Sequence, residues 1–363
     1  MTASAPSELD ALYAFGVAAG VAALLTPVTM RVARRVGAID QPRERGLSDR
    51  ETPLLGGLAI FVAAATSGAI WLPAAEPWIG IALAAALITV VGALDDRFDF
   101  PPWLKLIGQI GAAVIAVGVG GVDVKFVTLP FFGVLNLPND GHALTAIGLV
   151  AMMNVVNFSD GVDGLAAGVC AIVAVAFAVI AFSLAEQQHF GGVLAALTAG
   201  AAIGFLFHNF PPASSFMGDA GSNLLGLLMG CIAVQGDLKT SAVVTLALPL
   251  ILLAVPFLDT TFVVLKRLKY RRPVYAADQE HLHHRMARIG FSVRRTVLFF
   301  YGWTLMLAGY AVALRFIHYS NGRGHLRAGG TILVVALGLV VVAASVYLVY
   351  VLEILKFNRR SRR

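Results

Sequence analysis

The sequence predicts an all-α integral membrane protein with about eleven transmembrane helices. Of the 363 residues, 58% are hydrophobic and 13% are charged, whereas a soluble domain is about 45–50% apolar and about 25% charged. Many of the apolar runs approach or exceed the ~20 residues that a helix needs to cross a bilayer. Most charged residues lie between these runs, where loops are expected.

Hydrophobic windows give the order of the spans along the chain. They cover residues 10–31, 55–74, 78–94, 104–121, 142–157, 164–183, 192–208, 222–236, 242–264, 296–316 and 328–352. Between the fourth and fifth spans, residues 122–129 alternate polar and apolar side chains, and a Pro-Asn-Asp-Gly turn sequence follows at 138–141. This alternation predicts a short β-hairpin on the external side of the membrane.

The distribution of Lys and Arg predicts the orientation. On an alternating path through the membrane, 22 of the 27 basic residues lie on one face. Positively charged loops favour the cytoplasm, so we expect an external N-terminus and a cytoplasmic C-terminus. The net charge of +6 follows this pattern, and we therefore expect no nucleic acid as a partner.

We expect a single polytopic domain over residues 1–363. Its cytoplasmic loops are predicted near residues 32–54, 95–103, 158–163, 209–221 and 265–295, and a basic tail covers 356–363. The spacings Gly200-xxx-Gly204 and Gly226-xxx-Gly230 are typical of closely packed membrane helices.

Three clusters of aspartates lie at predicted cytoplasmic ends of the spans. They are Asp95-Asp96, Asp160-Gly-Val-Asp163 and Gly218-Asp219-Ala-Gly-Ser222. A carboxylate near hydrocarbon is costly and marks a candidate functional site. Because the alternating path brings all three clusters to the face of the basic loops, we expect them to form one site for a metal and phosphates.

Two asparagines precede the second cluster. Asn154 and Asn157 are three residues apart, so they share one face of a helix. A capped turn between helices would explain one aspartate, but two aspartates with two amides favour a functional site. Asp219 is either the N-cap of the eighth span or a ligand beside a phosphate bound at that helix N-terminus. Mg²⁺ would separate the two negative charges, because it binds one or two carboxylates together with phosphate oxygens.

The first cluster needs a cation. Asp95 and Asp96 are adjacent and repel one another unless a metal or a lysine neutralises them, and Lys105 at the start of the fourth span is the candidate. A solvated pair in a loop is the alternative.

The loop after the ninth span is rich in basic residues. It contains His281, His283, His284 and Arg285. We interpret this segment as an anion-binding surface; a zinc site and an ordinary basic loop are the alternatives.

In this order, the motifs resemble those of the polyprenyl-phosphate N-acetylhexosamine-1-phosphate transferases, the superfamily of WecA, TagO and MraY. The matching segments are Asp40-Gln-Pro42 with Gly56-Gly57, Asp95-Asp96 with Lys105, residues 154–165, residues 216–222 and His281-Leu-His283-His284. The His-x-His-His pattern and the number of spans resemble the WecA/TagO branch. The first cytoplasmic loop departs from the family pattern, since Gly46 and Ser48 replace a lysine and a histidine.

The resemblance implies transfer of an N-acetylhexosamine-1-phosphate, in the first instance GlcNAc-1-phosphate, from a UDP-sugar to undecaprenyl or another polyprenyl phosphate. UMP is released, and the product begins a cell-envelope glycopolymer. The implied enzyme lies in the bacterial plasma membrane with a cytoplasmic active site, uses Mg²⁺ or alternatively Mn²⁺, and forms a homodimer.

The resemblance also implies the roles of the site residues. Asp219 and Asn157 would hold the metal, and Asp95, Asp96 and Lys105 would act on the lipid phosphate. The residues implied for the nucleotide and the diphosphate are Asn154, Asp160, Asp163, His281, His283, His284 and Arg285.

Three alternatives remain. Within the same superfamily, an MraY-like phospho-MurNAc-pentapeptide transferase would use a different donor. A transporter or flippase would place its carboxylates near the membrane midplane, often in paired halves, and this sequence shows neither feature. A catalytically inactive scaffold is disfavoured because the acidic residues and the histidines are all present.

Overall fold

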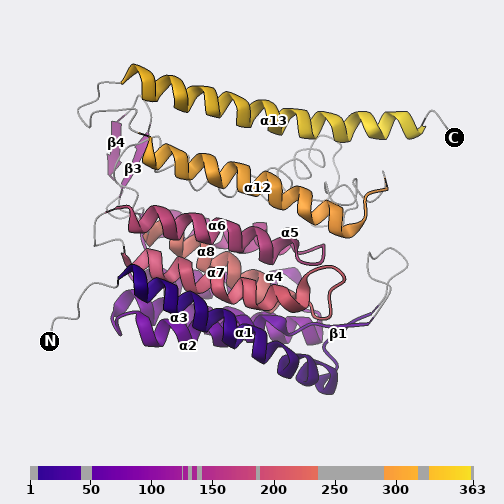
Figure 1. The fold of residues 1–363 in the computed structure, drawn as a ribbon. Coiled ribbons are helices and arrows are strands. Elements are labelled where there is room, and N and C mark those ends of the chain that lie inside the picture. Colours follow the sequence, from indigo (N-terminus) through magenta and orange to yellow (C-terminus); the bar gives the residue numbers. More distant parts are fainter. Residues whose placement is uncertain are drawn as a thin grey trace. The chain divides into compact units, whose positions relative to one another are not determined.

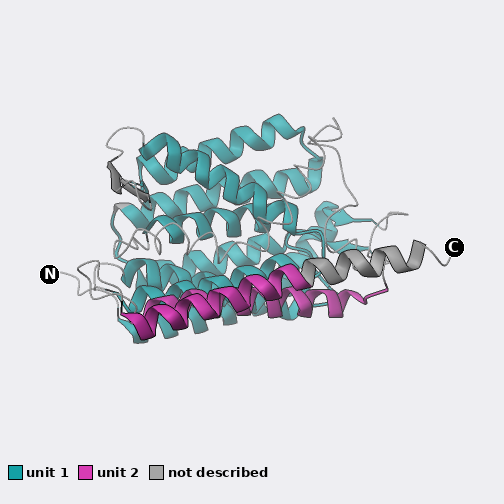
Figure 2. Ribbon diagram, turned by 90° about the horizontal axis from the view of Figure 1, so that it is seen from above, with its two compact units in different colours: residues 1–246 teal, residues 247–363 magenta. Residues whose placement is uncertain are grey.

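The computed structural model describes residues 7–41, 51–124, 126–129, 133–136, 141–184, 189–235, 290–317 and 327–360. The chain divides into two compact units, Met1–Leu246 and Ala247–Arg363, which have different colours in Figure 2. The helices that carry the described candidate site residues all belong to the first unit.

The described part of the first unit is a bundle of apolar helices running side by side (Figure 1). Its helices are α1 (Glu8–Val36), α2 (Gly56–Trp71), α3 (Glu76–Phe98), α4 (Pro102–Gly118), α5 (Gly141–Ser159), α6 (Leu165–Phe182), α7 (His189–Asn209) and α8 (Gly218–Gln235). Each predicted span from the first to the eighth coincides with one of these helices.

Two short antiparallel strand pairs lie at opposite ends of this bundle (Figure 1). At one end, β1 (Ile39–Asp40) pairs with β2 (Thr52–Pro53). At the other, β3 (Phe126–Leu129) pairs with β4 (Gly133–Asn136). The predicted hairpin is therefore confirmed, although its first strand begins at Phe126 and not at residue 122. Its position outside the membrane stays a prediction.

The helices extend beyond several of the predicted spans at their polar ends. The sequence predicts a loop at 95–103, but Asp95 and Asp96 lie in the last turn of α3. Likewise, α1 continues to Val36 and α5 to Ser159. Hydrophobic windows end where side chains become polar, whereas helical hydrogen bonding continues past the apolar segment. The loops at this end are correspondingly shorter than predicted.

Glycines at four-residue spacing allow close packing of the helices. A Cβ atom at Gly200 or Gly204 of α7 would collide with the backbone of α1. A Cβ at Gly226 of α8 would collide with the backbone of α5, and one at Gly230 with a leucine side chain of α5. Both predicted small-residue motifs therefore mark helix packing, because at Gly200, Gly204 and Gly226 only a hydrogen atom fits against the neighbouring backbone.

One helical turn after Gly204, a histidine of α7 contacts the backbone of α1. The Nε2 atom of His208 lies 3.0 Å from the carbonyl oxygen of Ala23. Pro27 lies inside α1 and lacks the N–H group that would bond to this carbonyl. His208 thus satisfies an acceptor that the proline leaves open.

The central helix of the first unit is α8. It packs against α2, α3, α4, α5, α6 and α7, and its side chains are buried from Ala220 to Ile232. Its start is anchored by the strand before α2, since the Phe216 N–H donates to the Pro53 carbonyl at 2.8 Å. The N-terminus of α8 is therefore held inside the bundle, next to the ends of its neighbours.

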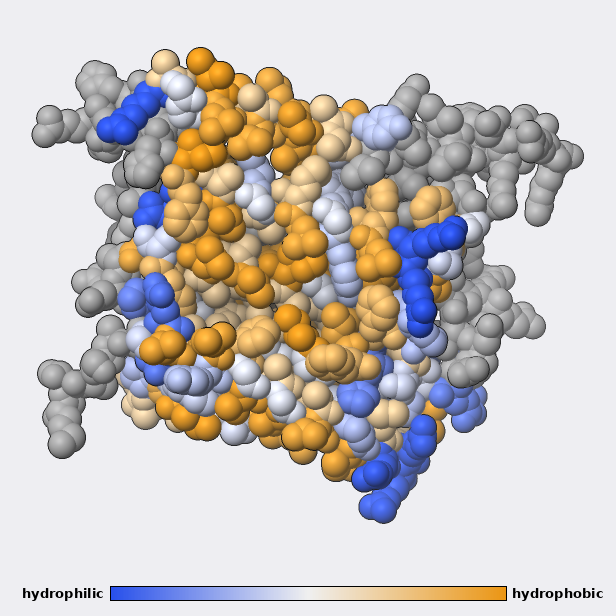
Figure 3. All heavy atoms as spheres, in the orientation of Figure 1, coloured by the Kyte–Doolittle hydropathy of each residue, from blue (hydrophilic) through white to orange (hydrophobic). Residues whose placement is uncertain are grey.

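The surface of the helices suits a bilayer. Figure 3 shows apolar side chains across the middle of one face and hydrophilic side chains near its two ends. Leu24 and Phe207 are 78% and 76% exposed, as expected for side chains in contact with lipid. Among the described residues, seven helices are long and apolar enough to cross a membrane, and α2 and α4 are shorter apolar helices. The number of eleven crossings and the orientation stay predictions.

The described part of the second unit consists of α12 (Val293–Phe316) and α13 (Ala328–Arg360), which pack against one another. The indole Nε1 of Trp303 donates to the Ser345 hydroxyl at 2.9 Å. These helices coincide with the tenth and eleventh predicted spans. The ninth span, 242–264, lies outside the described residues, as do most of the loop at 265–295 and residues 42–50 of the first loop.

Candidate active site

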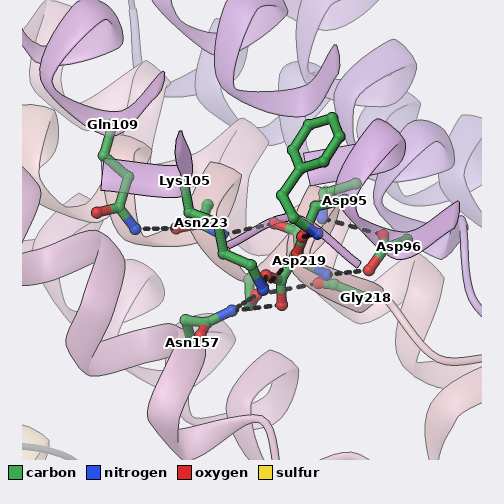
Figure 4. A network of polar contacts seen from close by, with 11 residues as sticks. Asp95, Asp96, Lys105, Gln109, Asn157, Gly218, Asp219 and Asn223 are labelled. Atoms are coloured by element: carbon green, nitrogen blue, oxygen red, sulfur yellow. Dashed lines mark hydrogen bonds and ion pairs between the residues drawn. The ribbon is translucent and has the colours of Figure 1, made fainter. Parts of the chain in front are cut away.

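The candidate site forms where four helix ends of the first unit meet. The C-terminal ends of α3 and α5 lie beside the N-terminal ends of α4 and α8 (Figure 4). Asp95 and Asp96 come from α3, Lys105 from α4, Asn157 from α5 and Asp219 from α8. All five were predicted as site residues, and the structure brings them together.

Lys105 bridges carboxylates from two helices. Its Nζ atom lies 2.5 Å from Oδ2 of Asp95 and 2.9 Å from Oδ2 of Asp219. The side chain of Asp95 is only 5% exposed, whereas that of Lys105 is 34% exposed. Oδ1 of Asp95 also accepts a hydrogen bond from the Phe100 N–H at 2.7 Å. Asp95 is therefore a buried and paired acid and not part of a solvated loop.

Asp219 is held through both of its carboxylate oxygens. While Oδ2 contacts Lys105, Oδ1 accepts a hydrogen bond from Nδ2 of Asn157 at 2.8 Å. The same Asn157 nitrogen lies 2.9 Å from the hydroxyl of Ser222. Asp219 thus links α4 and α5 to α8, and it lies within the first turn of α8 instead of capping that helix.

Asp96 provides the cap that the sequence suggested for Asp219. Its Oδ1 accepts from the backbone N–H of Asp219 at 2.7 Å, and its Oδ2 accepts from that of Ala220 at 3.2 Å. The first N–H groups of a helix have no partner within the helix and carry partial positive charge. Gly218 has φ +66°, and a Cβ atom there would collide with the Asp96 carboxylate. In this structure, the anion at the N-terminus of α8 is therefore Asp96.

A second layer of polar side chains lies one helical turn deeper in the bundle. Nδ2 of Asn154 donates to Oε1 of Gln109 at 2.8 Å, and Nε2 of Gln109 donates to Oδ1 of Asn223 at 2.8 Å. Nδ2 of Asn223 donates to the Asp219 carbonyl at 2.8 Å. Asn154, predicted as a nucleotide or diphosphate ligand, therefore contacts Gln109 in this structure.

The loop between α5 and α6 carries the other two predicted aspartates. Oδ2 of Asp163 accepts a hydrogen bond from the Ala213 N–H at 2.9 Å, and burial raises the pKa of Asp163. Burial also raises the pKa of Asp160 well above its usual range, and the nearby charges of Asp219, Asp96 and Asp163 raise it further. The aspartate clusters therefore share one end of the bundle, as predicted.

The loop after α7 is tied to the same region. Oδ1 of Asn209 accepts from the Gly164 N–H at 2.9 Å, and its Nδ2 donates to the Ser215 carbonyl at 2.9 Å. Asn209 is buried. It joins the loop between α5 and α6 to the loop between α7 and α8.

The donor atoms at the site suit a hard divalent cation. Asp95 and Asp219 supply carboxylates and Asn157 supplies an amide, next to the Lys105 ammonium group. In the described part of the chain, no group of three or more His, Cys, Asp or Glu side chains forms a metal-binding cluster. Mg²⁺ does not need one, because it is usually held by one or two carboxylates together with phosphate oxygens and waters.

Comparisons with known proteins identify the family of the chain. Residues 78–237 match the family described as glycosyl transferase family 4. The chain is also 35% identical over 294 residues to a probable undecaprenyl-phosphate N-acetylglucosaminyl 1-phosphate transferase of Bacillus subtilis (strain 168), with 80% of this chain and 81% of that protein covered. The chain belongs to glycosyl transferase family 4. This family is the superfamily that the motifs resemble.

Other relatives carry related names. The chain is 35% identical over 319 residues to a decaprenyl-phosphate N-acetylglucosaminephosphotransferase of Mycobacterium leprae (strain TN), covering 80% of each chain. It is 30% identical over 320 residues to a phospho-N-acetylmuramoyl-pentapeptide-transferase of Moorella thermoacetica, covering 83% of this chain and 97% of that protein. Both branches of family 4 are thus represented among its relatives.

The family 4 match covers the helix ends that form the site, from α3 to α8. His281, His283, His284 and Arg285 lie beyond it and outside the described residues, so their role stays a prediction. Sequence reasoning missed Gln109, Asn209 and Asn223. The available signal for Gln109 and Asn223 was a polar residue in an apolar helix, four residues after a predicted site residue.

Proposed function

We propose that this chain transfers GlcNAc-1-phosphate from UDP-GlcNAc to undecaprenyl or another polyprenyl phosphate. The observation that carries the proposal is the constellation of Lys105, Asp95, Asp219 and Asn157 where four apolar helices end. The names of the relatives that are 35% identical support GlcNAc as the sugar.

In the proposed reaction, an oxygen of the lipid phosphate attacks the β-phosphorus of UDP-GlcNAc. The bond between this phosphorus and the oxygen shared with the α-phosphorus breaks, so that UMP leaves with that oxygen. A phosphate monoester has its second pKa near ~6, so the nucleophile is already mostly dianionic near neutral pH. We therefore favour direct attack without a covalent phospho-aspartate intermediate.

Catalysis of phosphoryl transfer depends mainly on positioning the reacting groups and neutralising the phosphate charge. Asp219 and Asn157 would hold Mg²⁺, which when bound neutralises charge on the donor diphosphate. Lys105 holds an ammonium group between Asp95 and Asp219 and would bind phosphate oxygens there. Asp95 would orient Lys105 and the acceptor phosphate.

Other roles follow from the family resemblance and from the contacts of each residue. Asp96 would act through α8, whose first turn it caps. Asp160 and Asp163 would position the nucleotide. His281, His283, His284 and Arg285 would hold the diphosphate. We further propose that the site faces the cytoplasm in a bacterial plasma membrane, so that the lipid phosphate enters from the inner leaflet.

A second candidate donor is UDP-MurNAc-pentapeptide. The observation in its favour is the 30% identity to the Moorella thermoacetica protein over 97% of that protein's length. The same helix ends would serve this reaction, because the diphosphate and the lipid phosphate are common to both donors.

The test is UMP release and lipid-linked sugar formation by the purified protein with undecaprenyl phosphate and Mg²⁺. UDP-GlcNAc, UDP-GalNAc and UDP-MurNAc-pentapeptide are supplied separately. Turnover with UDP-GlcNAc that stops with EDTA is the expected result. Turnover with the pentapeptide donor alone would reassign the sugar, and no turnover from folded protein with any donor would refute the proposal.

Two matched variants link the activity to the site. Asp219→Asn should lower turnover by at least about 100-fold, the usual order for the loss of one preorganised charged group. Asp99→Asn changes a carboxylate at the C-cap of α3 and should keep wild-type turnover. Full activity in Asp219→Asn would contradict the proposed metal ligand.

A further inference from the structure

Three amide side chains form a continuous hydrogen-bonded chain beneath the candidate active site. We call Gln109, Asn154 and Asn223 the amide triad. Gln109 and Asn223 are each 5% exposed. Each amide comes from a different helix, since they lie on α4, α5 and α8 respectively.

The triad repeats the geometry of the site one helical turn deeper. Gln109 follows Lys105 by four residues on α4, and Asn223 follows Asp219 by four residues on α8. On α5, Asn154 precedes Asn157 by three residues. Residues at these spacings lie above one another on a helix face. Each triad member therefore lies one helical turn from a residue of the site, on the same face of the same helix.

The contacts join all three helices to one another. In the site layer, Asp219 of α8 contacts Lys105 of α4 and Asn157 of α5. In the triad layer, Gln109 of α4 contacts Asn154 and Asn223. The α4–α8 pair is thus linked in both layers, and the α4–α5 contact of the triad completes the triangle.

The hydrogen bonds of the triad all run in the same direction, from donor to acceptor. Asn154 donates to Gln109, Gln109 donates to Asn223, and Asn223 donates to the carbonyl of Asp219. Turning the Gln109 amide around would oppose two donors at one end and two acceptors at the other. The last bond reaches the backbone of the residue whose carboxylate contacts Lys105 and Asn157.

We propose that the amide triad is a positioning device that keeps α4 and α5 in register with α8. It thereby holds Lys105 and Asn157 on the two oxygens of Asp219. Apolar packing alone holds helices together but tolerates sliding, whereas one buried polar contact can specify register. The predicted effects on kcat rest on the proposed function. The predicted effects on thermal stability do not.

The first experiment compares Gln109→Met, Asn223→Leu and the double variant. Loss of a residue that supports a ligand typically lowers activity about 10–100-fold. We expect a fall in kcat of this size in each single variant, a KM for UDP-GlcNAc within about threefold of wild type, and a double variant no slower than the slower single one. Residues that act as a unit show such non-additivity.

A matched control separates positioning from general stability. The hydroxyl of Ser67 is buried and donates to the Ala14 carbonyl at 2.8 Å, joining α2 to α1. Ser67→Ala also removes one buried hydrogen bond between helices, and it should lower the Tm while kcat stays at the wild-type value. A folded Gln109→Met protein with kcat within twofold of wild type would overturn the proposal.

Gln109→Glu tests the directed hydrogen bonds through the pH dependence of kcat, which a purely structural role of Gln109 would leave unchanged. A protonated Glu can both accept from Asn154 and donate to Asn223, whereas an ionised Glu can only accept. We expect its kcat relative to wild type to fall as the pH rises. A pH-independent ratio would contradict the directed contact, and this variant also serves if Gln109→Met does not fold.

The outcome for the triad can be told apart from the outcome for the reaction. If the wild-type protein transfers no sugar, the proposed function fails. The Tm values of the same single and double variants then decide the triad: coupled losses support it, and additive losses refute it.

Discussion

At the level of single residues, Lys105 sets the charge balance of the site. Its ammonium group lies between the carboxylates of Asp95 and Asp219, which come from different helices. Asp95 is almost fully buried, and a buried carboxylate without a partner is costly. Lys105 therefore both stabilises the fold and supplies a positive charge near the expected phosphates.

Replacing Lys105 tests both roles. Lys105→Met should lower the free energy of unfolding by about 1–3 kcal/mol, because it removes charged hydrogen bonds and leaves two carboxylates without an opposite charge. Asp95→Asn in the same chain should restore part of the stability, since one uncompensated charge disappears, but it should not restore sugar transfer. Thermal unfolding in detergent and the UMP assay measure the two effects.

The control is Arg34→Met on the exposed side of α1. It removes a basic side chain from a helix end and should change stability by less than about 1 kcal/mol. If Lys105→Met proved no less stable than this control, the bridge would contribute nothing to the fold.

At the level of elements, the start of α8 depends on a residue from another helix. Asp96 of α3 accepts hydrogen bonds from the first turn of α8. This contact fixes Asp219 at the centre of the site, because the capped N–H groups belong to Asp219 and Ala220. Gly218 makes the contact accessible through its positive φ and its missing Cβ.

We expect Asp96→Ala to destabilise the protein by about 1–2 kcal/mol through loss of the cap. Gly218→Ala should cost at least as much, since it strains the backbone and obstructs the carboxylate. Gly148→Ala in α5 is the control, because nothing lies within 4 Å of its added Cβ. Since alanine is the better helix former, this change should raise the free energy of unfolding by up to about 1 kcal/mol. Equal Tm values for the two glycine variants would contradict the role of Gly218.

The loops beside the site should respond to pH. Burial raises the pKa of Asp163 in the folded state. Between the pKa of the unfolded state and this raised pKa, the folded state therefore keeps a proton that the unfolded state has lost. The free energy of unfolding therefore falls as the pH rises from about 4, near the ordinary pKa of about 3.9, through the raised pKa of the folded state.

Asp163→Asn removes this titration and keeps an oxygen that can accept the Ala213 N–H. Wild-type protein should therefore lose thermal stability relative to the variant as the pH rises through this window. Tm measurements from about pH 4 toward neutrality check the expectation, which a constant difference between the two proteins would rule out.

At the level of the whole molecule, the orientation in the membrane is open to a direct test. Cys170 and Cys231 are buried, so they should react little with a polar maleimide that cannot cross the membrane. Two exposed positions in loops at opposite ends of the bundle, Ala74 and Ser214, suit a new cysteine. The predicted topology places residue 74 outside and residue 214 in the cytoplasm.

In intact cells, the reagent should label Ala74→Cys and should label Ser214→Cys only after the membrane is opened. The reverse pattern would invert the orientation and place the candidate site outside. Labelling of both in intact cells would indicate that the span count between them is wrong.

Helix existence could be predicted because length and apolar composition act within one segment at a time. The predicted spans within the described residues coincide with helices, and the motif residues Asp95, Lys105, Asn157 and Asp219 proved to be neighbours. Helix ends were less predictable, since hydrogen bonding continues into the polar residues that close a hydrophobic window.

The sequence by itself therefore determined the membrane class, most helices and the family, and it predicted which polar residues form the candidate site. Only the tertiary structure decided which groups pair: Lys105 with Asp95 and Asp219, Asp96 with the start of α8, and Gln109 with Asn154 and Asn223. Lys105 and Asp219 are 114 residues apart. Their contact depends on the relative register and rotation of packed helices, and no pattern within a single helix encodes that register.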